Sequence, residues 1–232
     1  MRTLKVSLTE KLNALRVNTY FDELDRASLE RVAAHTHLRL FKRGEVLFRE
    51  GEECAGLHII RRGSVKLYRL APNGRQYIVR VLQEGETCNE VPVFDGGTNP
   101  VNVEALEETS VWVIEPTVLR ELLLESPEFA RKVIANFATN LRNLVHMASE
   151  MAFYQVTHRL ARLISRLPPE ELSGEKGRLT QEQIAARLGT VREVVARSLR
   201  ELERSGAIRV ERSRIYIADS DILAHWAEGP WN

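Results

Sequence analysis

The sequence predicts an α+β chain in which a β-rich N-terminal half is joined by one long helix to a C-terminal winged helix-turn-helix. Glycines recur every eleven or twelve residues between Gly51 and Gly96, which is typical of short strands in an all-β roll. After Pro116 the apolar pattern takes a helical period, and near the C-terminus two short helical segments precede two β-type runs. The expected domains are a β-roll sensor at 1–119, a dimerisation helix at 120–152 and a helix-turn-helix domain at 153–232.

The composition is that of an ordinary soluble globular protein and argues against several other classes. Hydrophobic residues make up 44% and charged residues 28%, and no apolar run approaches the roughly 18 residues that cross a bilayer. The N-terminus lacks a signal core, so we expect a cytoplasmic protein that makes no membrane contact. Cys54 and Cys88 show no CxxC spacing, which favours two reduced thiols. The net charge is only +1, but nine arginines against five glutamates lie between Arg178 and Arg214.

The N-terminal half predicts short helices followed by strands. Leu8–Arg31 has helical spacing, with Asp25 or Ser28 as possible caps. In one strand, Asn102 and Glu104 alternate with apolar residues and should form its polar face. Pro72-Asn73-Gly74 should close a hairpin. The strand-like runs are Val46–Phe48, Leu57–Ile60, Val65–Leu70, Tyr77–Leu82, Val101–Ala105 and Val111–Ile114.

The long helix should begin at Ser126-Pro127-Glu128, with Ser as N-cap and Pro at the first helical position, and run to about Ala152. Its apolar stripe is narrow and follows a/d spacing, which favours the seam of a homodimer over packing on its own domain. The predicted seam residues are Val133, Phe137, Leu141, Leu144, Ala148 and Met151. A second helix over about Gln155–Leu167 should end at Pro168-Pro169.

The helix-turn-helix is the most informative part of the sequence. Thr180 and Gln183 fit a capping box, and Gly189 fits the left-handed residue that ends a short helix. A second helix should start within about three residues and stop at Gly206. The strands Ala207–Val210 and Arg214–Ile217, joined through Arg212-Ser213, should form a wing. The inner faces of the two helices should be Ile184, Ala185, Leu188, Val195, Leu199 and Leu202.

The outer face of that second helix is rich in arginine, and crowding of like charge there would be relieved by a phosphate-bearing ligand such as DNA. Two simpler interpretations concern Glu193, which has Arg197 at the i,i+4 distance of a salt bridge and Thr190 at capping-box distance. The face consists of Arg192, Glu193, Ala196, Arg197, Arg200 and Arg204.

Three segments resemble the cyclic-AMP receptor protein/FNR (CRP/FNR) family in order and spacing, over nearly the whole chain: Gly85–Val91, Ala152–Leu160 and Leu179–Arg197. The resemblance implies a cyclic-nucleotide-binding-type β-roll, a homodimer, binding to double-stranded DNA, and recruitment or blocking of RNA polymerase. It places Arg192, Glu193 and Arg197 at base-reading positions. The residues expected at the DNA backbone are Gln181, Arg200, Arg209 and Arg212.

The same resemblance makes tight binding of cyclic AMP unexpected. The family's Gly-Glu pair and later Arg-Ser pair, which hold the phosphate, fall on Asn89-Glu90 and Asn99-Pro100, and the polar contacts from the long helix fall on Leu144 and Val145. Arg75 or Arg80 is the alternative source of positive charge. Candidates for the pocket of an unidentified small polar effector are Asn89, Glu90, Asn99 and Asn102, and a ligand-free regulator is equally compatible.

Other chemistries find little support in the sequence. Iron–sulfur relatives need four cysteines and this chain has two, so no cluster is expected, and for haem Cys88 offers at most a thiolate. The six histidines are scattered without a nucleophile motif or a phosphate-binding glycine loop, so no enzyme, catalytic residue or metal site is predicted. The alternative function is a cyclic-nucleotide-type regulatory module that does not act on DNA, which the wing and the basic helix disfavour.

Overall fold

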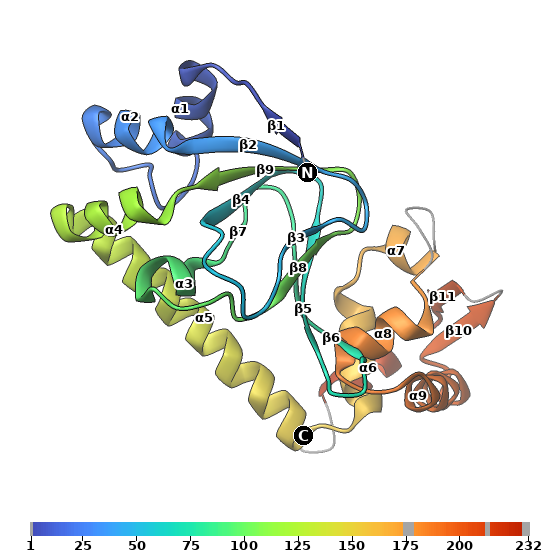
Figure 1. The fold of residues 1–232 in the computed structure, drawn as a ribbon. Coiled ribbons are helices and arrows are strands. Elements are labelled where there is room, and N and C mark those ends of the chain that lie inside the picture. Colours follow the sequence, from blue (N-terminus) through green and yellow to red (C-terminus); the bar gives the residue numbers. More distant parts are fainter. Residues whose placement is uncertain (1, 174–178, 212–213, 229–232) are drawn as a thin grey trace. The chain divides into compact units, whose positions relative to one another are not determined.

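The computed structural model describes residues 2–173, 179–211 and 214–228 (Figure 1). The chain divides into two compact units, Met1–Arg69 with Val79–Leu141, and Leu70–Ile78 with Arg142–Asn232. None of the helices in the described ranges combines the length and the apolar character needed to cross a membrane. The elements up to residue 125 are β1 (Arg2–Leu4), α1 (Leu8–Arg16), α2 (Arg26–Ala34), β2 (Thr36–Phe41), β3 (Val46–Phe48), β4 (Leu57–Arg62), β5 (Val65–Leu70), β6 (Gln76–Leu82), β7 (Thr87–Cys88), α3 (Glu90–Asp95), β8 (Asn102–Ala105), β9 (Thr109–Ile114) and α4 (Pro116–Glu125). The remaining elements are α5 (Pro127–Phe153), α6 (Val156–Arg166), α7 (Pro169–Ser173), α8 (Gln181–Leu188), α9 (Arg192–Arg204), β10 (Ile208–Glu211), β11 (Arg214–Ile217) and α10 (Ser220–Glu228).

The N-terminal strands form two antiparallel sheets, one of five strands in the order β1-β2-β9-β4-β7 and one of four in the order β3-β8-β5-β6. Their shared core contains Phe41, Ile60, Val65, Val103 and Val111, each at most 1% exposed. The six predicted strand-like runs are all confirmed as strands, within two residues at either end. The predicted runs do not include β1, β2 or β7, and the sequence did not predict the short α3.

The hairpin between β5 and β6 follows from its turn residues. The Gly74 amide donates to the Ala71 carbonyl at 2.8 Å, and the Ala71 amide donates to the Arg75 carbonyl at 2.8 Å. Gly74 takes a φ of +78°, whereas among non-glycine residues of the described chain only Asn89 has a positive φ. The predicted Pro-Asn-Gly turn is therefore confirmed, with Gly74 alone in the left-handed region.

A second N-terminal core lies where α1, α2, α4 and the first turns of α5 pack against the five-stranded sheet. It includes Leu15, Leu29, Trp112 and Leu119, and the rings of Phe21 and Phe129 stack with centroids 5.8 Å apart. Asp25 is confirmed as the cap of α2, since its carboxylate accepts from the Ser28 amide at 2.8 Å.

The long helix α5 begins where the sequence predicted, because the Ser126 hydroxyl accepts from the Phe129 amide at 3.2 Å. Its predicted seam changes character along its length. Val133 is 3% exposed and belongs to the core of the first unit, whereas Phe137 is only partly buried against that core. The assignment of Val133 to a dimer seam is therefore wrong, because its own domain already covers it, and the assignment of Phe137 stays a prediction.

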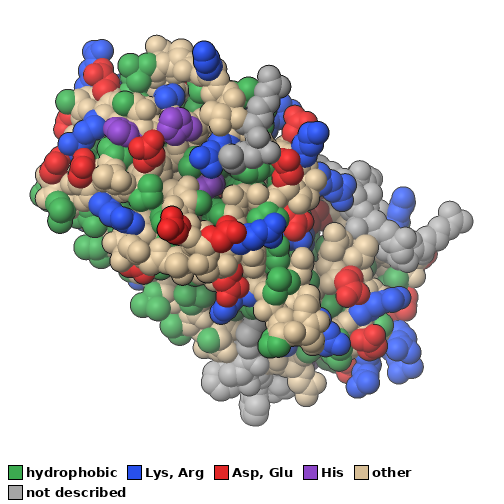
Figure 2. Space-filling model, in the orientation of Figure 1, with side chains coloured by type: hydrophobic (Ala, Val, Ile, Leu, Met, Phe, Trp, Pro, Cys, Tyr) green, Lys and Arg blue, Asp and Glu red, His purple; other side chains and the backbone are tan. Residues whose placement is uncertain are grey.

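Further along, α5 presents apolar side chains to solvent. Leu141 is 62% and Leu144 50% exposed, Ala148 is also exposed, and Ile134 and Val145 lie at helical spacing from them. Green side chains mark this helix along the lower left edge of Figure 2. The side chain of Met151 lies outside the described part.

The C-terminal unit is built around α6, which contacts α8, α9 and α10. Its core is formed by Leu160, Ile164, Ile184, Val195 and Leu202, each at most 1% exposed. The helix α6 ends at Arg166, before Pro168-Pro169 as predicted, and the short α7, which the sequence did not predict, follows it.

Candidate DNA-reading surface and effector pocket

The two helices of the helix-turn-helix are delimited by the chemistry the sequence predicted. The Thr180 hydroxyl accepts from the Gln183 amide at 3.2 Å, and the Gln183 side chain accepts from the Thr180 amide at 2.8 Å. Gly189 ends α8 with a φ of +63°. Helix α9 has Val191 at its N-cap without a side-chain cap, so the suggested capping box between Thr190 and Glu193 is wrong.

The outer face of α9 is exposed and charged. Arg192, Glu193, Arg197 and Arg200 are all exposed, and Val195, Leu199 and Leu202 point inward. No ion pair joins Glu193 to Arg197 among the described side chains, so the simple salt-bridge interpretation is also wrong. Blue side chains gather at the lower right of Figure 2, over the region that holds α9 and β10 in Figure 1. The arginine side chains of this surface can donate hydrogen bonds to a partner, and the Glu193 carboxylate can accept them.

Buried polar contacts fix α9 to α6. The Thr157 hydroxyl lies 2.9 Å from Ser198 Oγ and 2.7 Å from Glu201 Oε2. Thr157 and Ser198 are 5% and 3% exposed, so the contact is shielded from water. The sequence analysis did not identify these three residues, because they are 41 to 44 positions apart in the chain.

The residues predicted to lie along the DNA backbone come from separate elements. Gln181 is the first residue of α8, and Arg200 lies one turn along α9 from Ala196, to whose carbonyl it donates at 3.1 Å. Arg209 on β10 pairs with Glu211 at 3.0 Å, and its guanidinium lies 5.7 Å from the centre of the Tyr216 ring. Arg212 lies outside the described residues.

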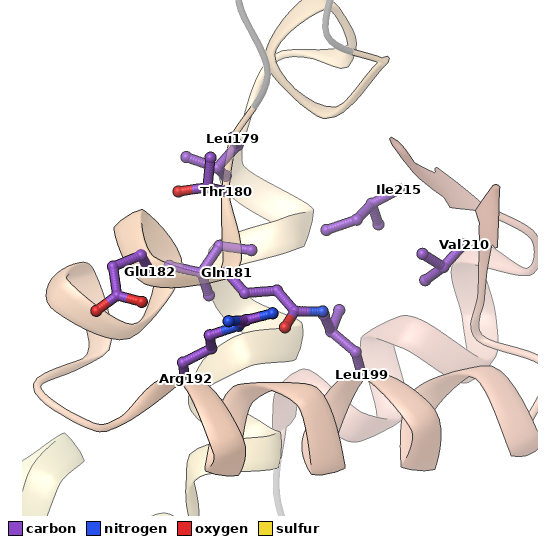
Figure 3. Close-up of a pocket in the computed structure, with 9 residues that line it drawn as sticks. Leu179, Thr180, Gln181, Glu182, Arg192, Leu199, Val210 and Ile215 are labelled. Carbon is purple, nitrogen blue, oxygen red and sulfur yellow. The ribbon is translucent and has the colours of Figure 1, made fainter. Parts of the chain in front are cut away.

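A cavity of about 360 Å³ opens between α8, α9 and the wing (Figure 3). Leu179, Ile184, Leu199 and Ile215 supply apolar walls, with Val210 beside them on β10. Thr180, Gln181, Glu182 and Arg192 complete the lining. The sequence analysis did not predict this cavity, because its walls come from three elements whose packing is set only in the folded domain.

In the β-roll, two of the four predicted pocket residues lie in direct contact. The Asn89 side-chain amide donates to Asn99 Oδ1 at 3.0 Å and to the Gly56 carbonyl at 3.1 Å. Asn99 is 1% exposed and donates to the carbonyls of Arg49 and Glu53 at 3.1 and 3.0 Å. The amide of Asn99 thus joins neighbouring loops of its own chain.

Glu90 and Asn102 lie in different surroundings. The Thr87 hydroxyl donates to Glu90, and burial, reinforced by the Glu90 charge, raises the pKa of the Tyr20 phenol. Asn102 accepts from the Glu50 amide at 3.2 Å and donates to the Tyr68 carbonyl at 3.3 Å. The strand pattern predicted that Asn102 lies on a polar, solvent-facing side of β8. Asn102 is only 7% exposed, so this prediction is wrong.

Three further groups of the roll, Cys54, Cys88 and His58, have pKa values shifted toward their uncharged forms. Burial raises the pKa of the Cys88 thiol well above its usual range and also raises that of Cys54. His58 is completely buried, lies with Nδ1 2.9 Å from the Gly56 carbonyl, and has its pKa lowered to about 4 by burial. Within the described ranges, no group of three or more histidine, cysteine or acidic residues is arranged to hold a metal ion.

An antiparallel β-roll followed by a long helix and a winged helix-turn-helix defines a class of two-domain transcription regulators. Residues 38–126 match the model of the cyclic nucleotide-binding domain, and residues 158–226 match that of the Crp-like helix-turn-helix domain. The chain belongs to the CRP/FNR family and is a DNA-binding transcription regulator with a cyclic-nucleotide-binding-type domain. The family consists of regulators and not of enzymes, and the interpretation as a module that does not act on DNA is set aside.

Relatives and solved structures agree with this placement. The CRP-like cAMP-activated global transcriptional regulator of Mycobacterium tuberculosis is 30% identical over 193 residues, covering 81% of this chain and 86% of the relative. A transcriptional regulator of the Crp/Fnr family from Eubacterium rectale aligns with a TM-score of 0.77 at 23% identity, over 91% of this chain and all of the other. The c-di-GMP responsive global regulator CLP of Xanthomonas campestris aligns with a TM-score of 0.70 at 23% identity, over 84% of this chain and all of the other. Both of these solved structures are similar in fold to this chain.

Proposed function

We propose that this regulator binds an inverted-repeat DNA site as a homodimer and reads bases with Arg192, Glu193 and Arg197. Its β-roll would sense an unidentified effector and would not bind cyclic AMP tightly. The proposal rests on the exposed outer face of α9, on which Glu193 and Arg197 form no ion pair with each other in the described part of the chain. A side chain already held in an ion pair would have to break it before reaching a base, and these two have no such pair among the described residues.

The chemistry of the three proposed base-reading residues suits G·C pairs. Each arginine can donate two hydrogen bonds to guanine O6 and N7, and Glu193 can accept from cytosine N4 in the major groove. Two arginines and one glutamate fit a half-site of the TGTGA kind. Gln181, Arg200, Arg209 and Arg212 would contact phosphates and set the register without choosing sequence. Recruitment or blocking of RNA polymerase is part of the proposal.

The dimer is supported by the exposed apolar face of α5. Leu141 and Leu144 from the predicted seam are joined on this face by Ile134 and Val145, each at least half exposed in the single chain. Side chains of this size at helical spacing are the form that a two-helix seam takes. Two copies of the helix-turn-helix domain, related by the two-fold axis of the dimer, would place the half-site centres about one helical turn, roughly 34 Å, apart.

The effector proposal rests on how the roll uses its own side chains. The names of the Mycobacterium and Xanthomonas proteins state activation by cAMP and a response to c-di-GMP, so the ligand varies among proteins with this fold. Here Asn99 stands where the resemblance places the phosphate-binding arginine, and its buried amide already bonds Arg49, Glu53 and Asn89. Arg80, an alternative cation, forms an ion pair with Glu86. A phosphate buried beside Asn99 would therefore lack the bidentate arginine that the resemblance places at this position.

Selection of binding sites from a random DNA pool tests the base-reading roles. We expect the wild type to recover inverted repeats rich in G·C contacts. Arg197→Ala should lose about 1 to 3 kcal/mol and relax the preference at one G·C pair, whereas Arg200→Ala should weaken all sequences alike and reduce the salt slope by about one. Recovery of sites without symmetry, or an unchanged preference in Arg197→Ala, would contradict the assignment.

A further inference from the structure

The cavity beside the reading helix has the form of a small-molecule site. Its volume of about 360 Å³ lies within the range of ligand pockets, roughly 300 to 1,000 Å³. Its floor is well packed, since Ile184, Leu199 and Ile215 are 1%, 5% and 5% exposed. The walls come from α8, α9 and both wing strands, with Val210 directly opposite Ile215 in the strand register.

Two polar side chains line the cavity beside this apolar floor. In Figure 3 the Arg192 guanidinium reaches up from α9 toward the side-chain amide of Gln181, which extends from the start of α8. Neither side chain has a hydrogen bond or ion pair to another residue in the part of the chain that the structure describes. The Glu182 carboxylate points away from them in the same view. A cation and an amide are thus both available at the mouth.

We propose that this cavity binds a small organic carboxylate with an aromatic or short aliphatic body. The body would lie over Val210, which is only partly buried, and along the small parts of Leu199 and Ile215 that line the cavity. The carboxylate would accept two parallel hydrogen bonds from the Arg192 guanidinium, the geometry in which this pair is strongest. Gln181 would donate a third bond from its amide.

The site would control DNA binding by competition. This consequence rests on the proposed function, in which Arg192 reads a base and Gln181 contacts a phosphate. A carboxylate on Arg192 would occupy the donors that the base requires, so occupation of the cavity and specific binding to DNA would exclude each other. The ligand would then act on the reading head itself, independently of the β-roll.

Direct binding to the full-length protein without DNA tests the site. The probe is 3-phenylpropanoate, with 3-phenylpropanamide as its uncharged match, followed by methyl NMR of Ile184, Leu199, Val210 and Ile215. We expect saturable shifts at these methyls, at least about tenfold weaker binding of the amide, and a similar loss in Arg192→Gln. Arg204→Gln removes an exposed charge from the same helix outside the cavity and should bind the acid as the wild type does.

The contrary results are equally definite. No saturable shift at the four methyls, equal binding of acid and amide, or unchanged affinity in Arg192→Gln would overturn the site. A gel shift then tests competition: the acid should raise the protein concentration needed for half-saturation of specific DNA, and the amide should not. Binding of the acid without an effect on DNA would overturn the competition alone, whereas a wild type that binds acid but no DNA would refute the proposed function and leave the cavity site standing.

Discussion

Replacing Leu141 with Glu should convert a dimer into a monomer. Complete burial of a leucine- or valine-sized side chain is worth about 1.5 to 3 kcal/mol, and Ile134, Leu141, Leu144 and Val145 are 68%, 62%, 50% and 59% exposed. Covering the exposed fractions would therefore contribute roughly 7 to 14 kcal/mol over two protomers. This is of the same size as the cost of association, so the seam has little surplus and a single change should be decisive.

The change removes the contribution of Leu141 from both protomers, about 2 to 4 kcal/mol in total. It also places two carboxylates near the two-fold axis. The lost burial alone should raise the dissociation constant by about 30- to 700-fold, since each 1.4 kcal/mol is a factor of ten, and repulsion between the carboxylates should raise it further. Sedimentation velocity across micromolar concentrations measures this shift, and a gel shift on a two-half-site DNA should lose affinity in parallel.

Leu124→Glu is the matched control, because Leu124 lies on α4 and is 88% exposed. It introduces the same charge away from the seam and should leave the dimer intact. The reasoning is refuted if the wild type sediments as a monomer at micromolar concentration while binding DNA specifically, or if Leu141→Glu and Leu124→Glu behave alike.

Three further predictions concern the pH response, the reading head and the pocket. His58 has a pKa of about 4 in the folded chain against 6.5 ordinarily, so the unfolded state binds the extra proton between these values and stability falls as the pH drops through this window. Urea unfolding at pH 7.5 and 4.5 should show about 2 to 3 kcal/mol of this loss in the wild type and in the exposed-site control His225→Gln but not in His58→Gln, and equal pH dependence in all three would contradict the buried neutral imidazole. Thr180→Ala should destabilise the protein by about 1 kcal/mol through loss of the α8 cap, measured by thermal unfolding, whereas Thr180→Ser should restore most of it. Calorimetry with cyclic AMP should detect no binding at micromolar concentrations, and a dissociation constant in that range or tighter would disprove the account of Asn99.

Local chemistry made most of the fold predictable. Asp25, Ser126 and Thr180 each cap a helix as expected, because the bonds that define a cap join residues within three positions. The glycine spacing located six strands for a similar reason, because the turns between strands need left-handed residues, which glycine adopts most readily. Gly74, with a φ of +78°, is one example.

The wrong predictions for α5 and β8 have a different cause. A stripe of period 3.5 indicates that one face of α5 is apolar, but it does not say which surface covers that face, so Val133 was assigned to a partner instead of to its own core. Similarly, alternation in β8 predicted a polar side for Asn102 but could not show that this side is buried against Tyr68 and Glu50. Contacts between residues 34 to 52 positions apart decide both the burial of Asn102 and the hydrogen bonds it makes.

The contact of Thr157 with Ser198 and Glu201 has a mechanical consequence for regulation. Because the buried hydroxyls of Thr157 and Ser198 hold α9 against α6, the reading helix cannot tilt by itself without leaving two buried hydroxyls unsatisfied. Each head should therefore travel as a rigid block when the protein changes state. In the proposed homodimer, an effector acting from a distance would change only the separation and orientation of two such rigid domains, and the helical repeat of the DNA fixes which separation fits both half-sites.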